Sequence, residues 1–149
     1  MPQPSASASG GGLLAITLKQ DDGYAEAGIY LVRGDGRGGR LLRGAGGNVR
    51  WSPDGRRLAF REARGTFGPY LLRVTDRAAR RTHTLALVRC CNIGLGNPTW
   101  SPGSDRVAYT RGIVESVAGR KVRTNRLFVA RADGRGERGI ALHEPGAPA

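Results

Sequence analysis

The chain has 149 residues, which is enough for one ordinary domain with its own core. Its hydrophobic share of 39% excludes a disordered chain, and no apolar run approaches the roughly 20 residues that a membrane-spanning helix needs. The net charge is +12 and 22 of the 24 basic residues are arginines, which is consistent with an acidic partner, a nucleic acid or a GC-rich genome.

The chain begins with a Ser/Gly-rich stretch, residues 1–12, that predicts a flexible tail. After it come short apolar segments of strand length, separated by turn residues at intervals near ten. Gly (24) and Pro (8) together make 32 of 149 residues, roughly twice the ordinary share. The pattern predicts an all-β fold. The predicted strands, in chain order, lie at 13–18, 28–33, 57–60, 69–74, 83–88, 106–110, 126–131 and 139–143. Residues 112–123 are predicted to form either a long hairpin or an excursion.

Two segments of the chain repeat the same order of residues, 49 positions apart. They are WSPDGRRLAF at 51–60 and WSPGSDRVAY at 100–109. A period of 40–50 residues with four strand-like pieces in each unit is typical of a β-propeller blade. The prediction is therefore a partial β-propeller of about three four-stranded antiparallel blades, at about 13–55, 56–104 and 105–145.

The repeated motif has a structural interpretation. We expect a type I turn at 52–55 and, because Gly103 stands at the third position, a type II turn at 101–104. The tryptophans are expected to fill the wedge between neighbouring sheets, with the small Ala59 and Ala108 where strands crowd together. The residues assigned to the motif are Trp51, Ser52, Pro53, Asp54, Gly55, Trp100, Ser101 and Pro102.

These segments resemble the TolB-type β-propeller repeat, the WD-like repeat of bacteria. Its pattern is an aromatic residue, SPDG, two variable residues and a short IAF-like strand, with an IYxxxxDG piece farther on. The companion pieces here are GIYLVRGDG (28–36), PYLLRVTD (69–76) and RLFVARADG (126–134), so the resemblance covers about 13–145. It implies a scaffold for binding, either an interaction protein or a substrate-gating domain ahead of a serine peptidase.

Three blades are fewer than the four that a closed propeller needs. The apolar end faces and strand edges of an open fan would be exposed to water. Three explanations stay open: the chain is a piece of a longer protein, it associates with itself to close a six-blade ring, or it is a degraded gene product.

The motifs for catalysis and cofactors have simpler interpretations. GDGRGG at 34–39 matches G-x-G-x-x-G, but no helix follows it, so a hairpin turn is expected. His83 and His143 have no neighbouring nucleophile in a catalytic pattern, and the adjacent Cys90 and Cys91 are expected to pack as small apolar residues. We expect no catalytic, cofactor or metal site. The aspartates of the turns, expected to accept backbone amides, are Asp54, Asp76, Asp105 and Asp133.

The sequence favours a non-enzymatic scaffold that binds a protein or ligand through its blade loops, with an acidic protein partner because the loops are rich in arginine. One alternative is the gating propeller of a serine peptidase without its catalytic domain. Another is a basic nucleic-acid-binding protein, which is less favoured because the arginines form no single stripe. No signal peptide is recognisable, so a cytoplasmic location is expected if Met1 is the true start, whereas the family resemblance suggests an extracytoplasmic one.

Overall fold

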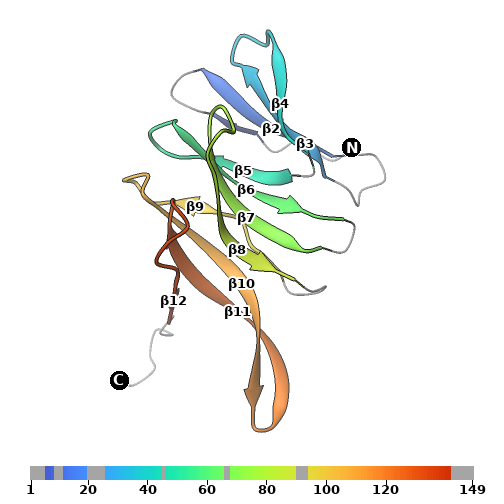
Figure 1. Ribbon diagram of the computed structural model, residues 1–149, viewed down its shortest axis with the longest axis vertical. Coiled ribbons are helices and arrows are strands. Elements are labelled where there is room, and N and C mark those ends of the chain that lie inside the picture. Colours follow the sequence, from blue (N-terminus) through green and yellow to red (C-terminus); the bar gives the residue numbers. More distant parts are fainter. Residues whose placement is uncertain are drawn as a thin grey trace.

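The computed structural model describes residues 6–8, 12–19, 26–44, 46–65, 68–89 and 94–141. These residues form three four-stranded antiparallel sheets that follow one another like the ribs of a fan (Figure 1). The sheets are consecutive in the chain, so the fold is an all-β partial propeller. No helix in the described ranges is long and apolar enough to cross a membrane.

Each sheet is a simple meander of four strands, numbered from the inner edge outwards. The first sheet has β1 (Ala6–Ala8), β2 (Leu13–Lys19), β3 (Glu26–Arg33) and β4 (Gly39–Arg43). The second has β5 (Gly46–Trp51), β6 (Arg57–Ala63), β7 (Tyr70–Asp76) and β8 (Thr82–Val88). The third has β9 (Thr99–Trp100), β10 (Arg106–Val117), β11 (Arg120–Arg131) and β12 (Arg138–Ile140).

The sheets are offset by one strand from the predicted units. The segment that ends at Trp51 opens the second sheet rather than closing the first, because Trp51 pairs with Leu58 across the Ser-Pro turn. Residues 6–8, which were assigned to the flexible tail, form strand β1 and pair with residues 14–16 of β2. The remaining residues of the predicted tail, apart from Gly12, lie outside the described residues.

The two Ser-Pro turns have the same geometry, so the predicted change of turn type is wrong. The Gly55 N–H donates to the Ser52 carbonyl at 2.8 Å, and Gly55 has a φ of 68°. In the second copy the Ser104 N–H donates to the Ser101 carbonyl at 3.0 Å, and Ser104 itself has a φ of 61°. Gly103 is not in the positive-φ region that the third position of a type II turn requires.

Two apolar clusters fill the spaces between the sheets. One joins the first and second sheets and includes Ile29, Leu58 and Phe60. The other joins the second and third sheets and includes Ala59 and Tyr109. Because side chains alternate along a strand, β6 supplies Leu58 and Phe60 to one cluster and Ala59 to the other, and all three are fully buried. The prediction that this strand is apolar on both faces is confirmed.

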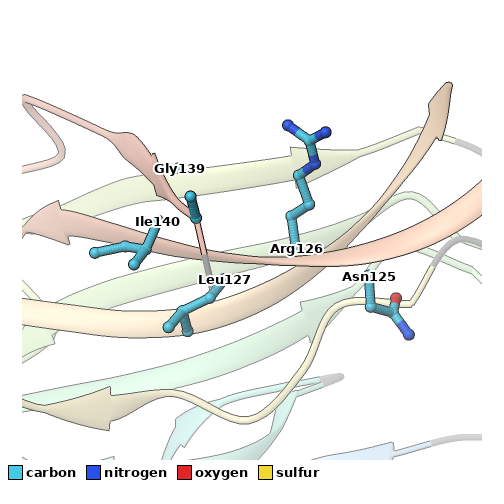
Figure 2. Close-up of a pocket in the computed structure, with 6 residues that line it drawn as sticks. Asn125, Arg126, Leu127, Gly139 and Ile140 are labelled. Atoms are coloured by element: carbon cyan, nitrogen blue, oxygen red, sulfur yellow. The ribbon is translucent and has the colours of Figure 1, made fainter. Parts of the chain in front are cut away.

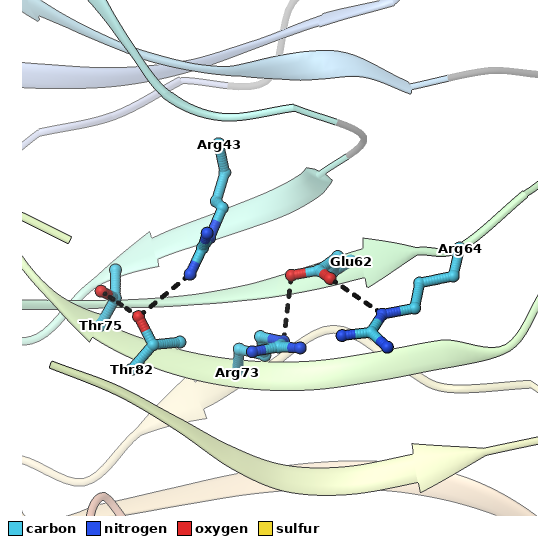
Figure 3. A network of polar contacts seen from close by, with 6 residues as sticks. All are labelled: Arg43, Glu62, Arg64, Arg73, Thr75 and Thr82. Carbon is cyan, nitrogen blue, oxygen red and sulfur yellow. Dashed lines mark hydrogen bonds and ion pairs between the residues drawn. The ribbon is translucent and has the colours of Figure 1, made fainter. Parts of the chain in front are cut away.

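A polar network accompanies the contact between the first and second sheets (Figure 3). The Arg43 guanidinium of β4 donates to the Thr82 hydroxyl of β8 at 3.3 Å, and the Thr82 and Thr75 hydroxyls are 2.9 Å apart. On the same sheet Glu62 lies 3.0 Å from Arg73, and both side chains are largely buried. Charged side chains thus take part in this interface beside the apolar cluster.

The third sheet carries a long hairpin, which settles the open prediction for residues 112–123. Strands β10 and β11 pair without a break from Arg106–Arg131 to Val117–Arg120. Their partners are much shorter, since β9 pairs with two residues of β10 and β12 with three of β11. The end of the hairpin therefore projects beyond the sheet as a two-stranded ribbon, which Figure 1 shows at the bottom of the view.

The face of the first sheet that packs on the second sheet provides a test of packing. The Thr17 hydroxyl is buried there without a hydrogen-bond partner, whereas the buried Thr75 hydroxyl is paired with Thr82. We expect Thr17→Val to raise the free energy of unfolding by about 1 kcal/mol, because it removes an unsatisfied polar group at constant shape. The matched control, Thr75→Val, should lower it by about as much. Urea unfolding followed by tryptophan fluorescence measures both, and a Thr17→Val protein less stable than the parent would contradict this packing.

Candidate functional site

The Ser-Pro motif forms the same set of hydrogen bonds in both copies. In the first, the Ser52 hydroxyl donates to the Asp54 carboxylate at 2.6 Å and accepts from the Arg57 N–H. In the second, the Ser101 hydroxyl donates to Asp105 at 2.9 Å. It accepts from the Arg106 N–H at 3.0 Å. Asp105 stands two places later in its motif than Asp54 does, yet its carboxylate has the same serine partner.

The two copies of the motif also contact each other across the boundary between the sheets. The Asp54 N–H donates to the Ser104 hydroxyl at 3.1 Å, and the Arg57 guanidinium donates to the Ser104 carbonyl at 2.9 Å. Ser104 is buried, although it follows an exposed turn. Ser104, which occupies the position of Gly55 in the first copy, therefore joins the second sheet to the third.

The tryptophans of the motif occupy corresponding places in successive interfaces. Trp51 is buried in the cluster between the first and second sheets. Trp100 packs against the next cluster, and its indole N–H donates to the Arg50 carbonyl at 3.1 Å. The Arg57 guanidinium lies 5.8 Å from the centre of the Trp100 ring. A groove of about 250 Å³ runs between the two tryptophans along Pro53, Pro98 and the inner strands.

One end of the fan gathers five hairpin turns, which we call the turn face. Because the strands of each sheet are antiparallel, the turns after its first and third strands lie at the same end. The turn face consists of the described residues 33–38, 52–57, 76–81, 101–106 and 131–136. Its ten arginines and five aspartates are Arg33, Arg37, Arg56, Arg57, Arg77, Arg80, Arg81, Arg106, Arg131 and Arg135 with Asp35, Asp54, Asp76, Asp105 and Asp133.

The aspartates of the turn face are engaged by their own turns. Asp76 accepts backbone N–H groups from residues 78, 80 and 81 at 2.9 to 3.0 Å. Partial burial opposes the shift, yet these hydrogen bonds hold the pKa of Asp76 below its ordinary value. The Ser52 hydroxyl and the Arg56 N–H lower the pKa of Asp54 in the same way, against a small cost of burial. The Arg135 N–H lowers that of Asp133. The prediction that turn aspartates accept backbone amides is confirmed at these three positions.

A groove of about 390 Å³ opens on the turn face between the second and third sheets. Val74 and Ala132 form its apolar part. Its cationic and polar part comes from three turns, β7 and β8, and consists of Arg56, Arg57, Thr75, Asp76, Arg81, His83 and Asp133. Asp76 and Asp133 are turn carboxylates with backbone partners, and the Arg57 guanidinium already donates to the Ser104 carbonyl. The exposed guanidinium groups of Arg56 and Arg81 are therefore the donors that the groove offers to an anionic group.

The groove is the part of the site that sequence reasoning missed. Its arginines stand in turns that are 25 residues apart in the sequence, and only the stacking of sheets brings them together. The available signal is the pairs of adjacent arginines at 56–57 and 80–81. His83, expected to be unremarkable, is exposed on β8 and lines the groove near the Asp133 carboxylate.

The remaining candidate residues either belong to a hairpin turn or lie outside the described residues. Residues 34–38 form the hairpin turn between β3 and β4, as expected from the missing helix. Cys90, Cys91 and His143 lie outside the described residues. Among the described residues, no group of three or more His, Cys, Asp or Glu side chains is placed to hold a metal ion.

The sequence matches no model of a protein family, and no curated protein is similar to it in sequence. Three solved structures have a similar fold. A putative TolB from Agrobacterium tumefaciens is 22% identical with a TM-score of 0.61, over 89% of this chain and 43% of that one. The β-propeller domain of the Trilobed protease from Pyrococcus furiosus is 15% identical with a TM-score of 0.56, over 93% and 57%. The acylaminoacyl peptidase of Pyrococcus horikoshii is 12% identical with a TM-score of 0.65, over 91% and 25%.

These comparisons show a partial β-propeller of the kind seen in TolB-like proteins and in the propeller domains of peptidases. In each case the chain spans less than two thirds of the length of the protein that it resembles. Identities at this level establish the fold alone.

Ser104 provides a test of the contact between the two motif copies. Ser104→Ala should lower the free energy of unfolding by about 1 to 2 kcal/mol, because the Asp54 N–H loses its acceptor. Ser104→Gly should lower the free energy of unfolding less, since glycine adopts the positive φ of this position without the strain of about 1 kcal/mol that other residues have there. The expected order of denaturation midpoints is therefore serine, then glycine, then alanine. Equal midpoints for glycine and alanine would show that the positive φ stores no strain.

The turn carboxylates predict an acid-labile fold. Their folded-state pKa values are depressed, so their contribution to stability is present above the unfolded-state value of about 4 and is lost as the pH falls through the lower folded-state values. We expect the urea concentration at the midpoint of unfolding to decrease when the pH is lowered below about 4. Asp76→Asn should flatten that pH dependence, because the amide does not titrate in this range, and should lower the stability at neutral pH, because the amide nitrogen cannot accept the Arg81 N–H. A midpoint that stays constant as the pH falls through this range would contradict the assignment.

Proposed function

We propose that this chain is a non-enzymatic β-propeller scaffold whose turn face binds an acidic protein partner. The observation that carries the proposal is the groove between the second and third sheets, with Arg56, Arg57 and Arg81 around an apolar floor. Arginine guanidinium groups bind carboxylates in a planar, bidentate geometry, so a glutamate or aspartate side chain of a partner suits this groove.

The charge balance of the turn face supports an acidic partner. Ten arginines and five aspartates leave it a net charge of +5 (10 minus 5). Three of the arginines form ion pairs within their own turns, namely Arg33, Arg106 and Arg131. Such exposed pairs contribute little energy and are easily exchanged for a partner's carboxylate. A positive face of this kind raises the rate at which an acidic surface associates with it.

A second candidate function is favoured by the comparisons with peptidases. The chain covers only a quarter of the length of the acylaminoacyl peptidase and resembles it in fold. A propeller that gates access to a hydrolase domain fits that coverage, with the catalytic residues supplied by another part of a longer protein. The reading frame around this chain tests the idea: an α/β-hydrolase domain encoded in frame would support it, and its absence would remove it.

Binding of a fluorescent oligoglutamate peptide at low ionic strength tests the acidic-partner proposal. Arg56→Ser with Arg81→Ser removes two exposed arginines of the groove and should weaken binding about tenfold, which corresponds to about 1.4 kcal/mol. The matched control removes two arginines from the projecting hairpin, Arg120→Ser with Arg123→Ser, and should change the affinity less than about twofold.

Equal losses in the two double variants would contradict a site on the turn face and indicate attraction by net charge alone. A duplex DNA measured in the same way separates the nucleic-acid alternative. DNA binding that is tighter than peptide binding and falls steeply with salt would favour that alternative over the scaffold.

A further inference from the structure

Neighbouring sheets pack against each other in the same way at both boundaries within the chain. At each end of the fan, one sheet face of the type used in these contacts has no neighbour. We call the face of a sheet that looks toward the following sheet its forward face, and the opposite one its rear face. The second sheet has both faces covered. The rear face of the first sheet and the forward face of the third are covered by no described residue.

The open forward face of the third sheet repeats the covered forward face of the second. In the second sheet, fully buried Ala59 pairs with Val74, and Leu72 pairs with Ala86 on the next strand. The third sheet has the same register, in which Ala108 pairs with Val129 and Leu127 with Ile140. The side chains are again small or apolar, but here they are partly exposed.

Figure 2 shows a groove beside β11 and β12 whose lining comes from both faces of the sheet, since Leu127 and Ile140 lie on the open face and Arg126 and Gly139 on the opposite one. Its volume is about 450 Å³, and Leu127, Gly139 and Ile140 contribute to its wall. Leu127 points away from Arg126, as the alternation along β11 requires (Figure 2). Gly139 pairs with Phe128, and a side chain at Gly139 would lie against the Phe128 ring on the opposite face, so the apolar surface of the open face here comes from Leu127 and Ile140.

The open rear face of the first sheet repeats the covered rear faces of the other two. Leu58 and Phe60 in the second sheet, and Val107 and Tyr109 in the third, are buried against the preceding sheet. In the first sheet the corresponding residues are Leu14 and Ile16, since Ile16 pairs with Tyr30 as Phe60 pairs with Arg73. The side chains described on this face are aliphatic or aromatic, and they are Leu14, Ile16, Leu18, Tyr30, Val32 and Leu41.

Such a continuous apolar face is costly in water. Leu18 is 45% exposed and Leu41 is 53% exposed. Each partly exposed leucine or isoleucine side chain forgoes part of the free energy that its full burial would contribute. Contiguous apolar patches of this kind mark interfaces.

We propose that a second copy of this chain covers both open faces. The rear face of the first sheet of each copy packs on the forward face of the third sheet of the other, and two copies close a ring of six sheets. One copy supplies three sheets, which is below the four to eight that closed propellers contain, and three copies would supply nine. Two copies therefore fit that range, and their twofold axis is the axis of the ring.

The contact needs no new type of interface. Every copy carries both complementary halves, and because the strands pair in equivalent register within each of the three sheets, corresponding residues face the neighbour each time. The projecting hairpin lies beyond the sheet edges and takes no part in the contact (Figure 1). A closed pair also covers every apolar sheet face. An open head-to-tail chain of copies would leave one such face exposed at each end.

Sedimentation equilibrium of the full chain at micromolar concentration tests the proposal. The expected mass is 31.6 kDa, twice the 15.8 kDa of one chain. Ile16→Glu on the rear face and Val129→Glu on the forward face should each reduce it to 15.8 kDa, with an unchanged β-sheet circular dichroism spectrum. Val117→Glu, at the exposed end of the hairpin, is the matched control and should remain a pair.

Mixing the two monomeric variants gives the decisive readout. The Ile16→Glu chain keeps an intact forward face and the Val129→Glu chain an intact rear face, so a mixture should form a mixed pair through one contact. A wild-type chain of 15.8 kDa at these concentrations would overturn the proposal and leave further sheets of a longer protein as the occupant. Loss of the pair in Ile16→Glu alone, with Val129→Glu unaffected, would also overturn it, because it would show that two rear faces meet each other.

Discussion

A β-sheet that is apolar on both faces is stable in water only when a neighbour covers each face, and the second sheet of this chain is built in that way. Leu58 and Phe60 on one side of β6 and Ala59 on the other are fully buried. No single sheet in the chain has a core of its own, so each depends on its neighbour for the burial of apolar surface. The order of the sheets, the roles of the tryptophans and the position of the groove all follow from this dependence.

The repeated turn keeps the stacked sheets in the same register. In both copies the arginine whose N–H the motif serine accepts stands five positions after that serine, so the strand that follows starts at the same point. A shift of one residue would exchange the two faces of β6 or β10 and leave the wrong side chains in each cluster. The motif therefore conserves the length and hydrogen bonding of the turn, while the residue types at its third and fourth positions change.

The sequence predicted the strands well because they are short, apolar and bounded by turn residues. The predicted strands do not include β5, since Gly46 and Gly47 look like turn residues. In the structure they belong to the strand, and Gly46 lies so close to Ile29 that a side chain there would meet it at 2.9 Å. The turn at 101–104 was mispredicted because a contact from another sheet holds Ser104 in a conformation that local propensity assigns to glycine. The groove could not be predicted, because its arginines come from turns that only sheet stacking brings together.

The two interfaces within the chain differ in how well their polar groups are satisfied, and this difference bears on where a binding site is best placed. Between the first and second sheets, the Thr17 hydroxyl and the Arg43 Nε are buried without hydrogen-bond partners. Between the second and third sheets, the Trp100 indole, the Ser104 hydroxyl and the Tyr109 hydroxyl all have partners across or beside the contact. Burial also raises the pKa of Tyr109, which keeps its hydroxyl protonated as a donor. Because a buried polar group without a partner costs free energy, these hydrogen bonds remove a cost of burial at the second interface. The arginine groove lies across this interface, which fixes the positions of its turns relative to one another, and the Arg57 guanidinium is held by the Ser104 carbonyl. The exposed Arg56 and Arg81 side chains are ordered only when a partner binds, and that ordering is part of the cost of binding.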